Sequence, residues 1–107
     1  MLEENEKINL TGEEAITILS EVEYILISLR NIARYYYHKE NGEVTDSEKN
    51  QYYQETTNFI DKNNVTHRLA LIRRVVSEKF NDELGDDDMD DIERELEKLQ
   101  CWEKPGD

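Results

Sequence analysis

The sequence predicts an all-α protein. We expect a long antiparallel helical hairpin whose second helix is kinked or broken near Asn63-Asn64, followed by a shorter C-terminal helix in a three- to four-helix bundle. Apolar residues recur every three or four positions, as on one face of a helix. Only four glycines and one proline occur in 107 residues, so few positions interrupt a helix. Two Thr residues are followed three positions later by Glu, a spacing typical of helix starts.

The first helix is expected to begin at Thr11, because Thr11 and Glu14 can each satisfy a backbone N–H of the other residue. An apolar stripe then follows helical spacing for about six turns. It comprises Ala15, Ile18, Leu19, Val22, Ile25, Leu26, Leu29, Ile32, Ala33 and Tyr36. The helix should end near Asn41-Gly42, since glycine readily adopts the left-handed backbone that stops a helix.

The second helix is expected to begin at Thr45, three residues before Glu48. Its apolar pattern changes phase at Asn63-Asn64, which predicts either a kink or a break there. The following segment should close at Leu84-Gly85, and the last helix should start at Asp86-Asp87-Asp88. We expect one domain over residues 1–107, with frayed ends at 1–10 and 102–107.

Charge is unevenly distributed along the chain. The total is −13, and residues 1–23 and 80–107 carry −6 and −9, whereas residues 24–79 sum to +2. Basic side chains in the hairpin can neutralise acids across it, for example Arg73 or Arg74 with Glu13, Glu14 or Glu21. The alternative is that some arginines form a binding face.

The acidic segment that follows Gly85 admits three interpretations. It can be the capped, solvated start of a helix, or a surface that meets a basic partner. A calcium loop is the third, but Asp91 stands where such a loop needs glycine for its sharp turn. The acidic residues predicted to bind a partner are Asp86, Asp87, Asp88, Asp90, Asp91 and Glu93.

Tyrosine is the second unusual feature, with six residues against two phenylalanines. Three consecutive helical residues cannot all face one core, and Tyr36 lies on the apolar stripe. Tyr35 and Tyr37 should therefore be partly exposed, and with Tyr53 they are predicted to bind a partner. The alternative is that the rings pack against one another beside the hairpin turn.

No pattern of catalytic residues is recognisable. The chain has no nucleophile beside a base, no glycine-rich phosphate loop and no HExxH spacing, so we expect no enzyme, cofactor or metal site. His38 and His67 are expected at the solvent edge, and Cys101 is expected to pack beside an anchoring Trp102. The acidic N-terminus and short apolar runs lead us to expect a cytoplasmic protein without a membrane segment.

Small size, acidic ends and exposed tyrosines favour a binding role. The first hypothesis is an inhibitor or antagonist of a basic partner protein, of the immunity-protein or phage anti-host type, including mimicry of nucleic acid; such a partner could be a nuclease or a nucleic-acid-binding protein. The alternative is a structural or adaptor module that homodimerises through Tyr24, Ile27 and Tyr35, so the chain is expected to be a monomer or a homodimer. Direct binding of nucleic acid through the arginines is disfavoured by the net charge.

Overall fold

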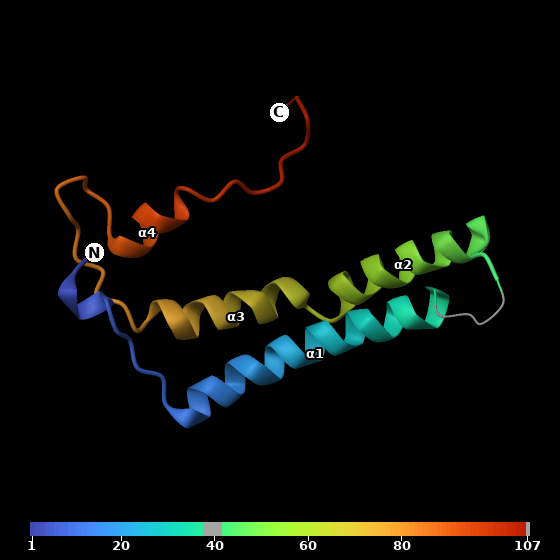
Figure 1. Ribbon diagram of the computed structural model, residues 1–107, viewed down its shortest axis with the longest axis horizontal. Helices are drawn as coiled ribbons and strands as arrows, with labels where there is room; N and C mark the ends of the chain where they lie inside the picture. Colours follow the sequence, from blue (N-terminus) through green and yellow to red (C-terminus); the bar gives the residue numbers. More distant parts are fainter. Residues whose placement is uncertain (38–41, 107) are drawn as a thin grey trace. The chain divides into compact units, whose positions relative to one another are not determined.

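The computed structural model describes residues 1–37 and 42–106 (Figure 1). Contacts within the chain form two compact units. Unit 1 comprises Met1–Leu10 and Val76–Asp107, and unit 2 comprises Thr11–Val75. The described residues contain helices and no strand, which confirms the all-α class. The expectation of one domain stays a prediction.

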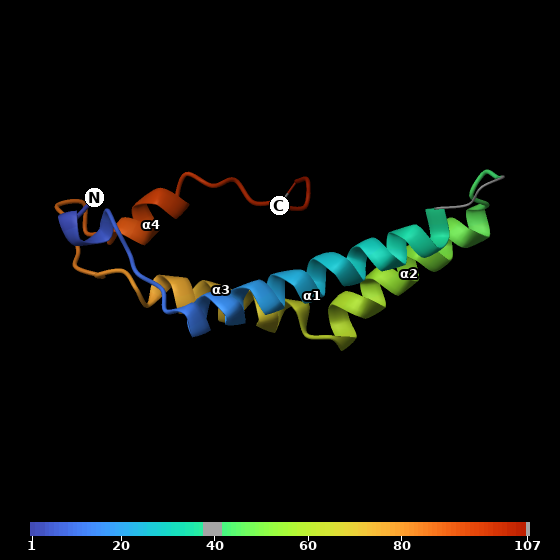
Figure 2. The ribbon, with the colours of Figure 1, turned by 60° about the horizontal axis from the view of Figure 1, so that its bottom comes forward.

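Unit 2 is built from the helical hairpin. Helix α1 (Gly12–Tyr37) packs against α2 (Asp46–Lys62), and α3 (Val65–Ser77) continues the return path alongside the first half of α1 (Figure 2). The last two residues of α3 belong to unit 1. The antiparallel hairpin and the packing of its three helices are therefore as the sequence predicts.

The predicted starts of α1 and α2 are both confirmed. The Thr11 N–H donates to Glu14 Oε1 at 2.9 Å, and the Glu14 N–H donates to Thr11 Oγ1 at 3.0 Å. Thr45 and Glu48 make the same reciprocal pair at 3.2 and 3.1 Å. The described part of α1 ends at Tyr37, and the predicted stop at Asn41 lies outside the described residues.

The change of phase at Asn63-Asn64 is a break between two helices. Asn64 has φ of +52°, in the left-handed region, where asparagine is tolerated better than other non-glycine residues. The Asn63 N–H still reaches the Phe59 carbonyl at 3.1 Å, and Arg68 Nε donates to the Asn63 carbonyl at 3.0 Å. The end of α2 is thus hydrogen-bonded, and α3 starts with its own phase.

Two predicted boundaries near the C-terminus are wrong. Helix α3 ends at Ser77 and not at Leu84. The N–H groups of Lys79 and Phe80 donate to carbonyls only three residues earlier, which ends the α-helical pattern. The Asn81 side chain then accepts from the Glu83 N–H and forms a turn. Helix α4 (Asp91–Leu96) starts five residues after Asp86, since the intervening segment forms a tight turn and Asp90 caps the helix.

The N-terminal end is more ordered than the sequence suggests. Glu3–Asn5 form a 3₁₀ turn, η1, and Asn5 is only 4% exposed. The expectation of fraying therefore does not extend to these residues. At the other end, residues 102–106 contain no helix and are exposed.

The apolar core of unit 2 is thin. Among the described large hydrophobic residues only Tyr36 and Val65 are buried, and none is fully buried. The stripe on α1 is covered on one side only: Ile18, Ile25 and Ile32 are half-buried, whereas Leu19 and Leu26 are 54% and 57% exposed. A single layer of helices leaves the other half of a broad stripe in solvent.

Candidate functional site

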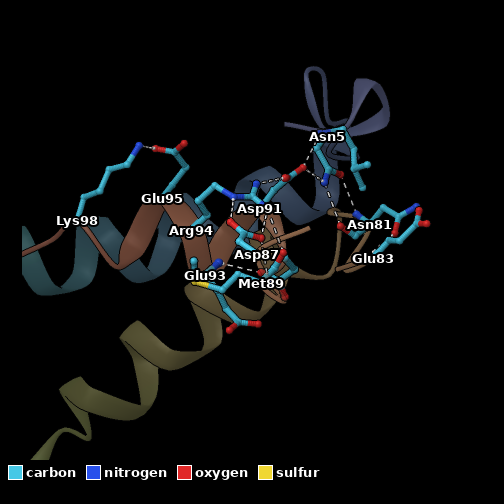
Figure 3. A network of polar contacts seen from close by, with 12 residues as sticks. Asn5, Asn81, Glu83, Asp87, Met89, Asp91, Glu93, Arg94, Glu95 and Lys98 are labelled. Atoms are coloured by element: carbon cyan, nitrogen blue, oxygen red, sulfur yellow. Dashed lines mark hydrogen bonds and ion pairs between the residues drawn. The ribbon is translucent and has the colours of Figure 1, made fainter. Parts of the chain in front are cut away.

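Arg94 is the centre of a polar network in unit 1 (Figure 3). It lies one turn after Asp91 on α4, and its Nη1 donates to Asp91 Oδ1 at 2.7 Å. Its Nε and Nη2 donate to the two oxygens of Asp87 at 2.6 and 2.9 Å, a bidentate pair. Nη2 also donates to the Met89 carbonyl at 3.0 Å. One guanidinium thus joins the helix to the acidic turn that precedes it.

Asp91 is the buried member of this network, at 4% exposure. Its Oδ2 accepts hydrogen bonds from Asn5 Nδ2 at 2.7 Å and from the Leu2 N–H at 2.8 Å. These two donors and Arg94 favour the carboxylate over the acid and lower the pKa of Asp91 to about 2.

The pairing of Arg94 with Asp87 favours the ionised form of both side chains. Hydrogen bonds from Arg94, and then from the Met89 N–H, lower the pKa of Asp87 well below its ordinary value. The pKa of Arg94 is raised by Asp87 and Asp91. All three groups are therefore ionised at neutral pH.

Asn5 ties the N-terminal segment to this network. Its Nδ2 also donates to the Asn81 carbonyl at 3.0 Å, and its Oδ1 accepts from the Asn81 N–H at 2.8 Å. The side chain is thereby satisfied although it is buried. Asn5 accounts for the order of the first residues of the chain.

The acidic turn is closed by backbone hydrogen bonds. The Gly85 N–H donates to the Met89 carbonyl at 2.9 Å, and the Asp88 N–H donates to the Gly85 carbonyl at 3.1 Å. Asp88 adopts φ of +61°. A Cβ at Gly85 would lie 2.6 Å from Arg94 Nη2, so glycine permits the close approach of the guanidinium.

The six acids predicted to bind a partner have three different environments. Asp86, Asp88 and Glu93 are exposed. Asp90 is half-buried and caps α4 by accepting from the Glu93 N–H at 2.8 Å. Asp87 is also exposed but pairs with Arg94, whereas Asp91 pairs with Arg94 and is too buried to belong to a binding surface.

Sequence reasoning missed the two residues that organise this site, Arg94 and Asn5. Arg94 could have been predicted to pair with the surrounding acids, because it is the single basic residue between positions 80 and 97. Asn5 carried no such signal, since its partner Asp91 lies 86 residues away along the chain.

The predicted exposure of the tyrosines is confirmed. Tyr36 is 9% exposed, whereas Tyr35, Tyr37 and Tyr53 are 77%, 44% and 58% exposed. The rings also pack on one another: Tyr52 lies 4.9 Å from Tyr37 and 5.7 Å from Tyr53, between ring centroids. Burial raises the pKa of both Tyr36 and Tyr37 above the ordinary value. Partner binding by these tyrosines stays a prediction.

Tyr24 is 38% exposed, and side chains from the return path of the hairpin hold it in place. Its hydroxyl donates to Asn63 Oδ1 at 2.9 Å, and the Arg68 guanidinium lies 4.1 Å from its ring centroid. Arg68 also pairs with Glu21 at 2.8 Å, a neutralisation across the hairpin. Of the predicted Tyr/Ile dimer face, Tyr35 is thus the most exposed member, with Ile27 at 37%.

Several side chains outside these clusters were also candidates. His67 is exposed as expected, and His38 lies outside the described residues. Cys101 and Trp102 do not pack together in a core: the thiol is exposed and the indole is 84% exposed, so that expectation is wrong.

Two kinds of feature are absent from the described residues. They contain no group of three or more His, Cys, Asp or Glu placed to hold a metal ion. None of the helices in residues 1–37 and 42–106 is long and apolar enough to cross a membrane.

The predicted site residues divide between the two units. The acids belong to unit 1, and the tyrosines belong to unit 2. They are therefore two separate candidate surfaces, an acidic turn braced by Arg94 and a group of partly exposed rings. Comparison of the chain with protein-family models, curated proteins and solved structures finds no match in any of the three.

Proposed function

We propose that this chain binds a basic partner protein through the acidic turn of unit 1 and inhibits or antagonises it. The observation that carries the proposal is the division of charge. Unit 1 has sixteen acidic and five basic residues, a net charge of −11, whereas unit 2 has ten acidic and eight basic residues, a net charge of −2. A concentrated negative field attracts a basic surface and speeds association.

The arrangement of the turn adds to this support. Arg94 pairs with the exposed carboxylate of Asp87 and the buried carboxylate of Asp91, and these bonds hold the turn in one conformation. The exposed carboxylates of Asp86 and Asp88 project from a backbone that is already closed by hydrogen bonds. A preorganised surface loses less conformational entropy on binding than a flexible acidic tail would.

A nuclease or another nucleic-acid-binding protein is the partner class that fits this chemistry. Such proteins bind phosphates through clustered Lys and Arg, and carboxylates held in a fixed array can occupy the same surface. The proposed function is thus of the immunity-protein or phage anti-host type, exercised in the cytoplasm.

The test begins with capture of partners from a lysate of the source organism at low salt. The captured protein is then purified, and its Kd is measured over a series of NaCl concentrations. We compare the wild type with a triple variant of the exposed acids, Asp86→Asn, Asp88→Asn and Glu93→Gln. We expect a basic partner, an affinity that falls with salt, and a triple variant that binds at least about tenfold more weakly.

The matched control neutralises three exposed acids of unit 2, Glu43→Gln, Glu55→Gln and Asp61→Asn. Its change in charge is the same, so it should bind as the wild type does if the acidic turn is the surface. Equal losses in the two triple variants, or an affinity indifferent to salt, would reject the proposal.

A further inference from the structure

Helix α1 carries a second apolar line that no described part of unit 2 covers. Leu19, Val22 and Leu26 follow at steps of three and four and are 54%, 38% and 57% exposed. Tyr37 lies eleven residues after Leu26, close to three full turns, so it falls on the same line. These four residues run beside the half-buried line of Ile18, Ile25 and Ile32 that faces the hairpin interior.

Helix α2 extends this surface. Tyr53 and Ile60 lie seven residues apart on α2 and are 58% and 41% exposed. Tyr36 and Tyr52 face each other across the hairpin, and Tyr37 and Tyr53 each follow by one residue. In two antiparallel helices this step turns to the same side, so the two apolar lines share one side of the hairpin. We call this surface the Leu26 face, and it consists of Leu19, Val22, Leu26, Tyr37, Tyr53 and Ile60.

The opposite side of the hairpin has different chemistry. Tyr35 follows Leu26 by nine residues, which corresponds to about half a turn beyond two full turns and therefore to the other side of α1. Glu55 borders the depression that Tyr35 and Asn31 line there, and nearer the start of α1 Arg68 covers Tyr24. Tyr35 and Tyr24 are also exposed on that side, but they lie beside polar side chains, so the Leu26 face is the more continuously apolar of the two.

The Leu26 face approaches the size of one side of a protein interface. From Leu19 to Tyr37 α1 rises about 27 Å, and α2 lies roughly 8–10 Å to its side. The projected area is on the order of 500 Å², and the accessible area of the side chains above it is greater. A standard interface buries about 800 Å² on each partner.

Charged side chains at the edge of the Leu26 face indicate which molecule binds there. Glu23 and Arg30 are exposed on α1, and neither takes part in an ion pair within the described residues. If two α1 helices cross antiparallel at Leu26-Ile27, Glu23 of each copy lies opposite Arg30 of the other. A two-fold axis forms this pair twice, so the surface is complementary to itself.

We infer that a second copy of this chain packs on the Leu26 face, with α1 against α1 in antiparallel orientation. Each hairpin contributes α1 and the return path of α2 and α3, so two copies form a bundle with four helical arms whose core lies between them. Unit 2 carries a net charge of only −2, so repulsion between the two hairpins is small. This inference is independent of the proposed binding by unit 1, because no residue of the acidic turn contributes to it.

Sedimentation equilibrium of the full chain tests the inference at micromolar concentrations. The wild type should be a dimer, and Leu26→Glu should be a monomer with unchanged helix content by circular dichroism. Tyr35→Glu is the control, since it introduces the same charge at a more exposed residue on the other side of α1. It should remain a dimer. A monomeric wild type overturns the inference, and so does a dimer that Tyr35→Glu disrupts and Leu26→Glu leaves intact.

A charge exchange tests the antiparallel register without altering the apolar face. Glu23→Arg and Arg30→Glu each place like charges opposite one another twice and should weaken the dimer roughly tenfold. The double variant restores opposite charges and should return the Kd to within about threefold of the wild type. If the double variant loses as much dimerisation free energy as the two single variants lose together, the proposed register is overturned. This test remains valid even if Leu26→Glu fails to fold.

Discussion

At the scale of single residues, Asp91 and Arg94 decide the structure of the acidic segment. A carboxylate that is 4% exposed needs hydrogen-bond donors, and Asp91 obtains them from Asn5, Leu2 and Arg94. Arg94 in turn engages Asp87 through both carboxylate oxygens. Of the acids that look available in the sequence, Asp91 is therefore an internal part of unit 1, and Asp87 is exposed but bound to Arg94.

Acidification should remove the contribution of Asp91 to stability. Its pKa falls from 3.8 to about 2 on folding, so the carboxylate stabilises the folded unit above about pH 4 and ceases to do so as the pH falls towards 2. We expect Asp91→Asn to destabilise unit 1 at pH 7 and to match the wild type near pH 2.

The measurement is denaturant unfolding at several pH values, followed by the NMR signals of Asn5 and Asn81. Asp86→Asn is the matched control, because this neighbouring aspartate is exposed. A difference between the wild type and Asp91→Asn that stays constant from pH 7 to pH 2 would contradict the assignment.

At the scale of elements, helix ends are set by local backbone chemistry. Thr11 and Thr45 start α1 and α2 through reciprocal hydrogen bonds with Glu14 and Glu48. Asn64 separates α2 from α3 by adopting a left-handed conformation. This single residue lets the apolar line of α3 take a new phase, so that Val65 is buried.

Substitution of Asn64 should separate backbone conformation from side-chain contacts. Asn64→Gly should leave the free energy of unfolding unchanged within about 0.5 kcal/mol, because glycine adopts positive φ freely. Asn64→Val should cost about 1–2 kcal/mol, because a β-branched residue is strained there. Urea unfolding monitored by circular dichroism gives both values. His67→Val, at an exposed position of α3, provides a control for the added branching, and a loss as large as that of Asn64→Val would refute the explanation.

At the scale of the whole molecule, charge is partitioned between the two units. Unit 1 holds −11 of the total −13 and unit 2 holds −2. Like charges that are not paired repel one another and destabilise a compact state, and salt screens this repulsion. The electrostatic cost of folding therefore falls mainly on unit 1.

Salt should consequently stabilise the two units to different extents. Raising NaCl from about 0.02 M to about 0.5 M shortens the screening length from roughly 20 Å to below 5 Å. We expect slower hydrogen exchange in residues 1–10 and 80–96, with a smaller change in the α1 and α2 amides. Mass spectrometry of peptides from each unit measures this difference directly. An equal response of both units would show that the partition of charge has no energetic consequence.

Prediction from the sequence succeeded where the determining interactions are local. The capping pairs, the break at Asn64 and the inward position of Tyr36 between two exposed tyrosines all depend on residues within a few positions of one another. It failed at Ser77 and Asp86, where helical spacing continues in the sequence. After Ser77 the helix is replaced by a side-chain turn at Asn81, whose backbone N–H and carbonyl are bound by Asn5. At Asp86 it is replaced by the turn that Arg94 holds.

The sequence by itself determined the all-α class, the hairpin, the helix starts at Thr11 and Thr45 and the acidic character of the chain ends, because periodicity, capping pairs and composition express these features directly. Only the tertiary structure decided which acids remain exposed, since Asn5 and the Leu2 N–H reach Asp91 from the other end of the chain. It also decided which half of the broad stripe on α1 is covered. A helical pattern defines an apolar face, but only the packed neighbours determine how much of that face they bury.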